Sequence, residues 1–150
     1  MIGFSRRRLP HLRVIAALLL AGILVACTTP ANLRARNRGR INQLSVGLVR
    51  DEVLALLGTE PQWVCLGGPA CILLPMIYLE KATNPHRIER AETPDGTELE
   101  ILFYQTETRK ADGAIADNEL TPIVLEDGRL VGWGWIFLRQ NTERYDIKLD

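Results

Sequence analysis

The sequence predicts an α+β fold in which two short N-terminal helices pack on a small antiparallel sheet, giving two layers. Three features predict it: an apolar stripe at helical spacing near residue 50, alternation of apolar residues near residue 100, and a hairpin signal near residue 127. Helices that precede strands in separate blocks are typical of α+β domains. The chain after residue 40 is long enough for one such domain with a modest core.

A first helix or ordered arm is expected over 32–44. This stretch is polar and basic, but Leu33, Ile41 and Leu44 are apolar.

A second helix is predicted over 50–57, where the apolar residues of RDEVLALL recur at helical spacing. Asp51 and Glu52 fall in the first turn, where negative charge favours the helix dipole. Gly58 then gives a stop signal, and Pro61 follows it. This short helix is therefore marked at both ends.

Strands are expected after the second helix. The runs 62–66 and 72–79 are apolar and β-prone, and Asn84–Pro85 marks a break. Between 98 and 106, every second residue from Leu99 to Phe103 is apolar, which predicts another strand.

The last two predicted strands, 122–125 and 130–138, flank the turn signal Glu126–Arg129. In the second of them, Trp133 and Trp135 would share one face, and the other face is also apolar. The tryptophan face either packs into the core under a loop or forms an exposed aromatic strip. In the second case Trp133 and Trp135 are candidate partner-binding residues, because tryptophan is enriched at interaction hot spots. Gly132 and Gly134 would let a helix approach the sheet closely.

The N-terminus has the pattern of a lipoprotein signal peptide, residues 1–26. Basic residues precede an apolar run, VIAALLLAGILVA, over 14–26. A membrane-spanning helix needs about 20 residues, so this shorter run is typical of a signal-peptide core. The Leu24-Val25-Ala26-Cys27 sequence that ends it resembles a lipobox.

Cys27 is therefore the predicted lipidation site, carrying a diacylglycerol thioether and an acyl group on its new α-amine. Two or more acyl chains anchor a protein stably, whereas one does so only marginally. Thr28 stands where aspartate would favour retention in the inner membrane. By similarity to lipoproteins with that sorting rule, the expected location is the periplasmic face of the outer membrane rather than the inner membrane.

Charge divides the mature chain into a basic neck and an acidic head. All 18 acidic residues lie at Asp51 or later, together with nine basic ones, so residues 51–150 carry a formal charge of −9. Residues 27–40 are expected to form a lipidated basic linker, and 41–150 a single domain. The compartment and the acidic head argue against nucleic-acid binding.

Cys65 and Cys71 are candidates for a disulfide, because an oxidising periplasm permits one. Two buried free thiols are the alternative. A metal site is not expected, since His86 is the single histidine after Cys27. No nucleophile–base arrangement and no cofactor motif is apparent in the sequence, so the protein is predicted to be a non-enzyme without a cofactor other than its covalent lipid.

Two motifs resemble the SmpA/OmlA, or BamE-like, family of small outer-membrane lipoproteins. The first is the pattern Leu44-x-x-Gly47-Leu48-x-x-x-x-Val53-x-x-Leu56-Leu57-Gly58-x-x-Pro61. The second is ELTPIVLEDGRLVGWGW, Glu119 to Trp135, which is similar to an uncharacterised sister group. The likeness covers most of 40–138. It implies a fold similar to β-lactamase-inhibitor proteins, with two helices against a short antiparallel sheet.

Val49 departs from the family pattern, in which Ser or Thr caps the second helix. Valine has no side-chain acceptor, so this helix should start more weakly or be capped in another way.

The predicted function is that of a non-catalytic envelope lipoprotein that binds another envelope protein, in outer-membrane assembly or maintenance. The alternative is a lipoprotein that binds a lipid or another small ligand, using the apolar segment 72–79 beside the aromatic strand.

Overall fold

The computed structural model describes residues 28–66, 79–110 and 114–147. The predicted signal peptide, Cys27 and Cys71 lie outside these residues, and so does most of the strand expected over 72–79. Within the described residues, no helix combines the length and apolar character needed to cross a membrane.

The two expected N-terminal helices are present as α2 (Pro30–Ile41) and α3 (Arg50–Leu57). Most of the segment predicted as a basic linker, 27–40, is therefore helical, and the linker prediction is wrong from Pro30 onward. Leu33, Asn37 and Ile41 recur every fourth residue and are all buried. This spacing places them on one face of the helix and leaves the other faces to the arginines.

Each helix start has a local cause. Thr29 caps α2, because its Oγ1 accepts a hydrogen bond from the N–H of Asn32 at 3.2 Å, and Pro30 occupies the first turn. At the start of α3, Val49 contributes no side-chain cap, as expected. Instead, the Val49 N–H donates to Oε2 of Glu52 at 3.0 Å, which is one half of a capping box.

The strands form two antiparallel sheets among the described residues. A two-stranded sheet pairs β1 with β2, and a four-stranded sheet has the order β3-β4-β5-β6. The bounds are β1 Gln62–Cys65, β2 Leu79–Ala82, β3 Arg87–Glu92, β4 Glu98–Gln105, β5 Leu120–Glu126 and β6 Arg129–Trp133. The predicted break at Asn84–Pro85 separates β2 from β3. A short 3-10 helix, η1 (Asp117–Glu119), precedes β5.

The strand β3 was not expected from the sequence. It lies at an edge of the four-stranded sheet, and its residues are exposed or half-buried. Its sequence, RIERAE, therefore lacks the apolar alternation that marked β4. Charged side chains on an edge strand oppose pairing with another chain.

The strand predicted over 130–138 is wrong in its second half. β6 ends at Trp133, and α6 (Gly134–Gln140) starts at the next residue, followed by α7 (Thr142–Tyr145). Gly134 has a φ of +84°, which turns the chain out of the strand. The run 130–138 is apolar almost throughout, so periodicity could not separate a strand from a helix.

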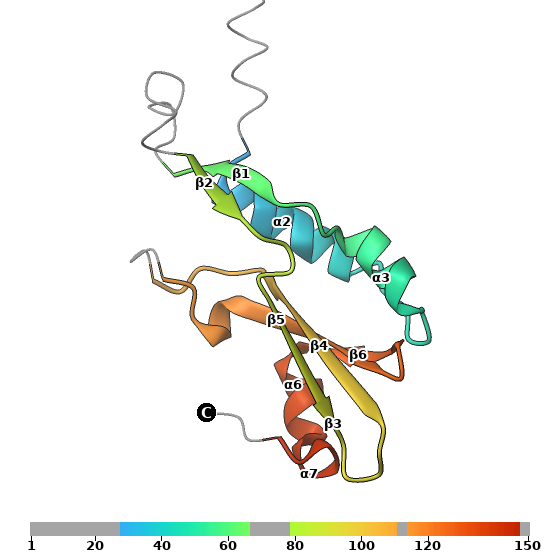
Figure 1. The fold of residues 1–150 in the computed structure, drawn as a ribbon. Helices are drawn as coiled ribbons and strands as arrows, with labels where there is room; N and C mark the ends of the chain where they lie inside the picture. The colour runs from blue at the N-terminus through green and yellow to red at the C-terminus, as the bar shows by residue number, and fades with distance from the viewer. Residues whose placement is uncertain (1–27, 67–78, 111–113, 148–150) are drawn as a thin grey trace, which may run out of the picture.

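The four-stranded sheet has a hydrophobic cluster on each face. On one face, α2 and α3 pack through residues such as Ile41, Val53 and Leu57 against Leu102 and Ile123. On the other, residues of α6 and α7 pack against alternate residues of the same strands. The predicted α+β class, with a helical layer on an antiparallel sheet, is confirmed. The sequence did not predict that α6 and α7 would cover the other face of the sheet (Figure 1).

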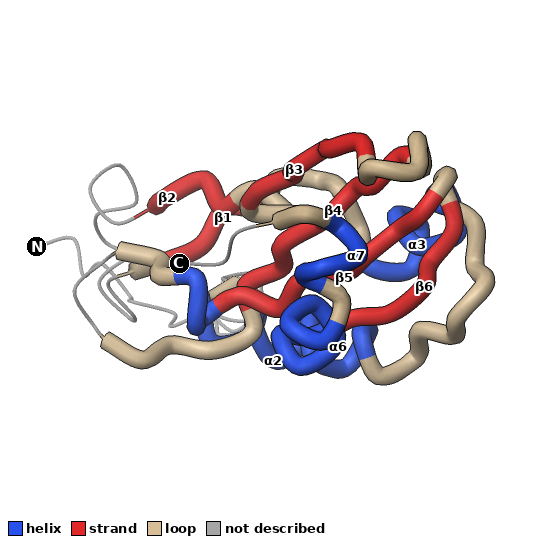
Figure 2. Tube along the Cα trace, turned by 90° about the horizontal axis from the view of Figure 1, so that it is seen from below, coloured by secondary structure: helices blue, strands red, loops and turns tan. Residues whose placement is uncertain are grey.

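The hairpin of β1 and β2 lies at one end of the molecule. Figure 2 shows it beyond the ends of the four longer strands, with α3 toward the opposite end. The N-terminal end of α2 lies beside the same hairpin (Figure 1).

Candidate functional site

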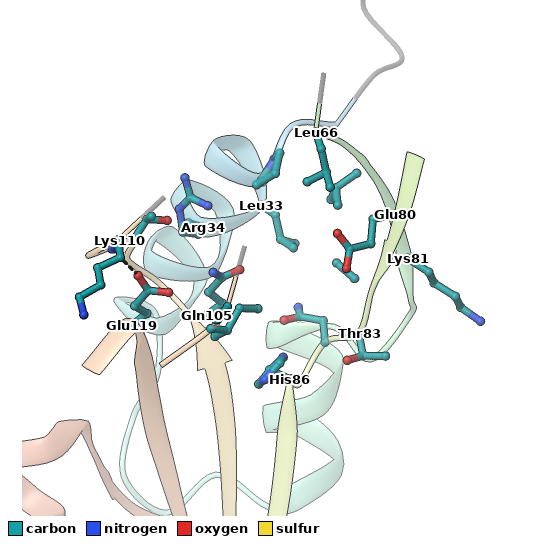
Figure 3. Close-up of a pocket in the computed structure, with 17 residues that line it drawn as sticks. Leu33, Arg34, Leu66, Glu80, Lys81, Thr83, His86, Gln105, Lys110 and Glu119 are labelled. Atoms are coloured by element: carbon teal, nitrogen blue, oxygen red, sulfur yellow. Dashed lines mark hydrogen bonds between the residues drawn. The ribbon is translucent and has the colours of Figure 1, made fainter. Parts of the chain in front are cut away.

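A pocket of about 280 Å³ opens between α2, the β1–β2 hairpin and the segment that leads to η1. Figure 3 shows the side chains that line it, which come from parts of the chain far apart in sequence. Four of the apolar lining residues are Leu33, Val64, Leu66 and Ile115. Leu33 and Val64 are buried, whereas Leu66 and Ile115 are 58% and 38% exposed at the mouth. The pocket thus has an apolar interior and an apolar lip.

Charged side chains of both signs stand on opposite walls. Arg34, Lys110 and Glu119 lie on one side of the pocket, where the Lys110 side chain is directed outward, and Glu80 points into the pocket from β2 on the other side, while Lys81 points away (Figure 3). An apolar interior edged by charged groups of both signs suits a ligand that has both apolar and hydrogen-bonding groups, such as a peptide segment.

Glu119 fixes the wall that carries Lys110. Its side chain is buried and accepts hydrogen bonds from the N–H groups of Arg109 and Lys110, the latter at 3.1 Å. These backbone hydrogen bonds hold the pKa of the Glu119 carboxyl below its ordinary value, and the bond from Arg109 has the largest effect. The carboxylate is therefore a charged structural element near neutral pH, which folds this segment back onto η1.

The floor of the pocket rests on two buried asparagines. Asn37 and Asn84 exchange amide hydrogen bonds of 3.2 and 3.1 Å. Asn37 also donates to the carbonyl oxygen of Gln105 at 2.8 Å, and Asn84 to that of Leu57 at 3.3 Å. One network thus joins α2, the end of α3, the β2–β3 connection and the end of β4. Such a satisfied buried network holds its surroundings in one arrangement.

The strand β2 borders the pocket with its main chain. The consecutive residues 80–84 all line it, although alternate side chains of a strand point to opposite faces. Among the described strands, β2 pairs with β1 alone. Within the described part of the chain, no other strand pairs with the second edge of β2.

The predicted anchor joins the chain beside this pocket. Thr28 forms a parallel bridge with Val64, and the Cys65 N–H donates to the Thr28 carbonyl oxygen at 2.9 Å. Pro30, two residues later, lines the pocket. The first described residue is thus already part of the folded head.

A second concavity, of about 1030 Å³, lies at the face covered by α6 and α7. Trp135 lines it, and its Nε1 donates to the carbonyl oxygen of Leu120 at 2.7 Å. Arg87 also lines it, with its guanidinium 4.2 Å from the centre of the Phe103 ring.

The structure separates the two tryptophans predicted as one strip. Trp133 packs against the cluster under α2 and α3, and Trp135 against the cluster under α6 and α7. Both are half-buried. They lie on opposite faces of the sheet because the chain turns between them at Gly134. The prediction that Trp133 and Trp135 share one face is therefore wrong. Partner binding by either residue stays a prediction.

The remaining predicted site residues are only partly described. Cys65 is buried and disulfide-bonded. Cys71 lies outside the described residues, so the pairing of these two cysteines stays a prediction, as does the lipid on Cys27. Among the described residues, no group of three or more His, Cys, Asp or Glu side chains has the arrangement of a metal site.

The pocket itself was not foreseen from the sequence. Its lining comes from four separated stretches, and none of them has a motif of its own. Leu33 was identified as an apolar helix residue, but only the fold brings it opposite Val64 and Ile115. Glu80 and Lys110 carried no signal that distinguished them from other surface charges.

Comparison with known protein families gives a match to part of the chain. Residues 83–140 match a family model described as "Protein of unknown function (DUF3192)". The matched stretch runs from just before β3 to the end of α6, so it contains the whole four-stranded sheet and excludes α2, α3 and the β1–β2 hairpin. Neither the curated proteins nor the solved structures gave a match.

Proposed function

We propose that this chain is a bacterial envelope lipoprotein with a non-catalytic head that binds a segment of another envelope protein. Lipid on Cys27 anchors it at the periplasmic face of the outer membrane. The signal-peptide pattern and the lipobox support the anchor. The observation that carries the binding role is the pocket, which is lined in part by β2, a strand that pairs with β1 alone among the described strands.

In this proposal the bound segment is extended. Its backbone adds to β2, and one of its apolar side chains enters the pocket between Leu33 and Ile115. Strand addition of this kind draws affinity from main-chain hydrogen bonds and specificity from pockets for alternate side chains. The carboxylate of Glu80, which points into the pocket, would select a basic or hydrogen-bond-donating group beside that side chain (Figure 3). Maintenance or assembly of the outer membrane is the setting that the resemblance to BamE-like lipoproteins suggests.

Matched isoleucine variants test the pocket. Ile115 at the mouth is 38% exposed, and Ile88 on β3, which does not line the pocket, is 42% exposed. We expect Ile115→Asp to lose binding, because a carboxylate in the apolar mouth must be desolvated when the partner binds. Ile88→Asp should bind as the native chain does.

The measurement is photo-crosslinking in cells from a photoreactive residue at position 115, compared with the same residue at position 88. A discrete protein adduct from 115, absent from 88 and competed by excess unlabelled head domain, is expected. Equal labelling from both positions, or no protein adduct from 115, would refute the pocket as a protein-binding site.

A lipid or another small ligand is the second candidate. The apolar interior formed by Leu33 and Val64, with Leu66 at its mouth, lies beside the predicted lipid anchor, which favours this alternative specifically. Native mass spectrometry of the head released from detergent decides it. A bound species that Ile115→Asp removes would support the small-ligand alternative, and its absence would count against it.

A further inference from the structure

We infer that the outer face of the β1–β2 hairpin, formed by Trp63, Leu79 and Lys81, rests in the interfacial layer of the membrane that carries the anchor. This docking rests on the proposed lipidation of Cys27. It adds that the head lies on the bilayer in a fixed orientation rather than at the end of a flexible tether.

The connection between the lipid and the fold is short. Thr28 is held to β1 by its bridge to Val64 and by the hydrogen bond from Cys65, and α2 starts at Pro30. Consecutive α-carbons are about 3.8 Å apart. The backbone that carries the lipid is therefore one residue from the hairpin, too short a connection for the hairpin to leave the membrane surface.

The composition of the face also suits a membrane interface. Trp63 is 62% exposed and Leu79 is 39% exposed, in a protein whose other two tryptophans are half-buried. Lys81 is the cross-strand partner of Trp63, so the two side chains share a face. Tryptophan is enriched at membrane–water interfaces, and lysine extends its ammonium to the headgroups while its stem stays in apolar surroundings.

The pocket lies on the other face of the same hairpin. Val64 and Glu80, which are also cross-strand partners, line the pocket, and Figure 3 shows Lys81 directed away from it. Cys65 shares this outer face but is buried, so Trp63, Leu79 and Lys81 are the accessible side chains that can meet the membrane without closing the pocket.

Charge supports a membrane surface as the occupant. Arg36 lies near this end, where its guanidinium donates to the side-chain oxygen of Gln62 at 2.9 Å. Gln62 and Trp63 are neighbours in β1 and point to opposite faces, so Lys81 is the basic side chain on the outer face itself, in a chain whose residues from 51 onward carry a formal charge of −9. Basic side chains near an anionic membrane surface are attracted to its headgroups.

A face this small would bind a bilayer weakly by itself. Because the lipid on Cys27 already holds the chain at the membrane, the contact becomes intramolecular, and a high effective concentration makes it persist. Docking would then present the edge of β2 and the pocket beside the membrane, where a partner close to the surface can reach them.

The test uses the full-length lipidated protein in phosphatidylcholine vesicles containing about one-fifth anionic lipid, a charge content chosen so that basic groups are attracted. Flotation with the vesicles is measured first. Tryptophan emission is then compared between plain vesicles and vesicles whose acyl chains carry bromine close to the headgroups. One protein keeps only Trp63 (Trp133→Phe, Trp135→Phe), and its matched control keeps only Trp135 (Trp63→Phe, Trp133→Phe).

We expect the emission of Trp63 to shift to the blue on membrane binding and to fall by about half or more in brominated vesicles, since interfacial side chains reach about 5–10 Å into the headgroup boundary. Trp135 should emit equally in both. In case the double variants misfold, Trp63→Phe alone should abolish the bromine-quenchable part of the native emission. Equal emission of Trp63 in both vesicles, with flotation intact, would overturn docking and leave the anchor standing. Loss of flotation would overturn the anchor and the docking together.

Discussion

The ring of Phe137 in α6 lies where a β-carbon on Gly132 in β6 would have to go. An ideal β-carbon at Gly132 would come within 2.5 Å of two ring carbons. Through this contact α6 packs closely on the sheet. The contact requires a residue without a side chain in the middle of β6.

Gly132→Ala is therefore expected to lower the free energy of unfolding by about 1–3 kcal/mol, the usual cost of overpacking a well-filled core. Gly39 in α2 is the matched control, because it is helical and exposed, and a β-carbon added to it would meet nothing within 4 Å. Gly39→Ala should raise stability by about 0.5–1 kcal/mol. Urea unfolding of both variants checks the opposite signs. If Phe137→Leu failed to relieve the Gly132→Ala variant, the ring would not be the cause.

The carboxylate of Glu100 joins α3 to the sheet. It is buried and accepts from Arg50 at 2.6 and 3.1 Å and from Arg90 at 2.6 Å. Burial of this carboxyl raises its pKa, but the hydrogen bonds and charges of the two arginines outweigh burial, so the net pKa lies below its ordinary value.

A carboxylate with a depressed pKa in the folded protein stabilises the fold above its unfolded pKa, and this stability is lost as the pH falls through the folded value. The native chain should therefore lose stability progressively below about pH 4.5, close to the ordinary value for Glu. Glu100→Gln should lower stability by about 1 kcal/mol at pH 7, since both arginines stay partly solvated. The stability of the variant should also fall less steeply than that of the native chain as the pH is lowered. Thermal melts between pH 7 and pH 3 measure both effects. If the native chain and the variant lost stability equally with falling pH, Glu100 would not be the group responsible.

The start of α3 lacks half of a capping box. Val49 has the extended backbone of an N-cap, and Glu52 already accepts its N–H. Val49→Thr would add the missing side-chain acceptor, so we expect it to stabilise the protein by about 0.5–1 kcal/mol. The same substitution at Val46, which is 66% exposed and precedes the helix, should leave the melting temperature unchanged. A gain at both positions would point to removal of an exposed valine rather than to capping.

The three tryptophans should differ in their access to solvent. Trp63 is 62% exposed, while Trp133 and Trp135 are half-buried against separate clusters. In the head without lipid, acrylamide should quench Trp63 most, and Trp63→Phe should therefore lower the overall quenching constant more than the same change at 133 or 135. A larger drop at either of the other two would mean that its cluster is open, as a partner-binding tryptophan requires.

The sequence by itself was sufficient where the signal is local. The bounds of α3 agree with the residues predicted for it, because charge in its first turn and Gly58 after its last are properties of a short stretch. The strand expected over 98–106 is β4, where apolar residues recur at every second position from Leu99 to Phe103. The α+β class follows from the order of these elements.

Local signals failed where two neighbours in space decide the outcome. The apolar run after Arg129 fits a strand and a helix equally well. The turn at Gly134 and the packing of Phe137 on Gly132 make its first part a strand and its second part a helix. β3 could not be seen because an edge strand buries little, so its residues need not alternate. α2 was mistaken in part for a linker because its buried stripe contains Asn37, whose partner, Asn84, is 47 residues away.

The candidate pocket belongs wholly to the tertiary structure. The sequence determined that the chain carries a lipobox-like Cys27, a short helix marked at both ends and a meander of strands. It could not determine that Leu33, Val64 and Ile115 line one pocket or that Thr28 is bound to β1, because a pocket depends on residues brought together by long-range pairing. Side-chain periodicity reports how each element is buried, whereas the space left between elements depends on how they pack.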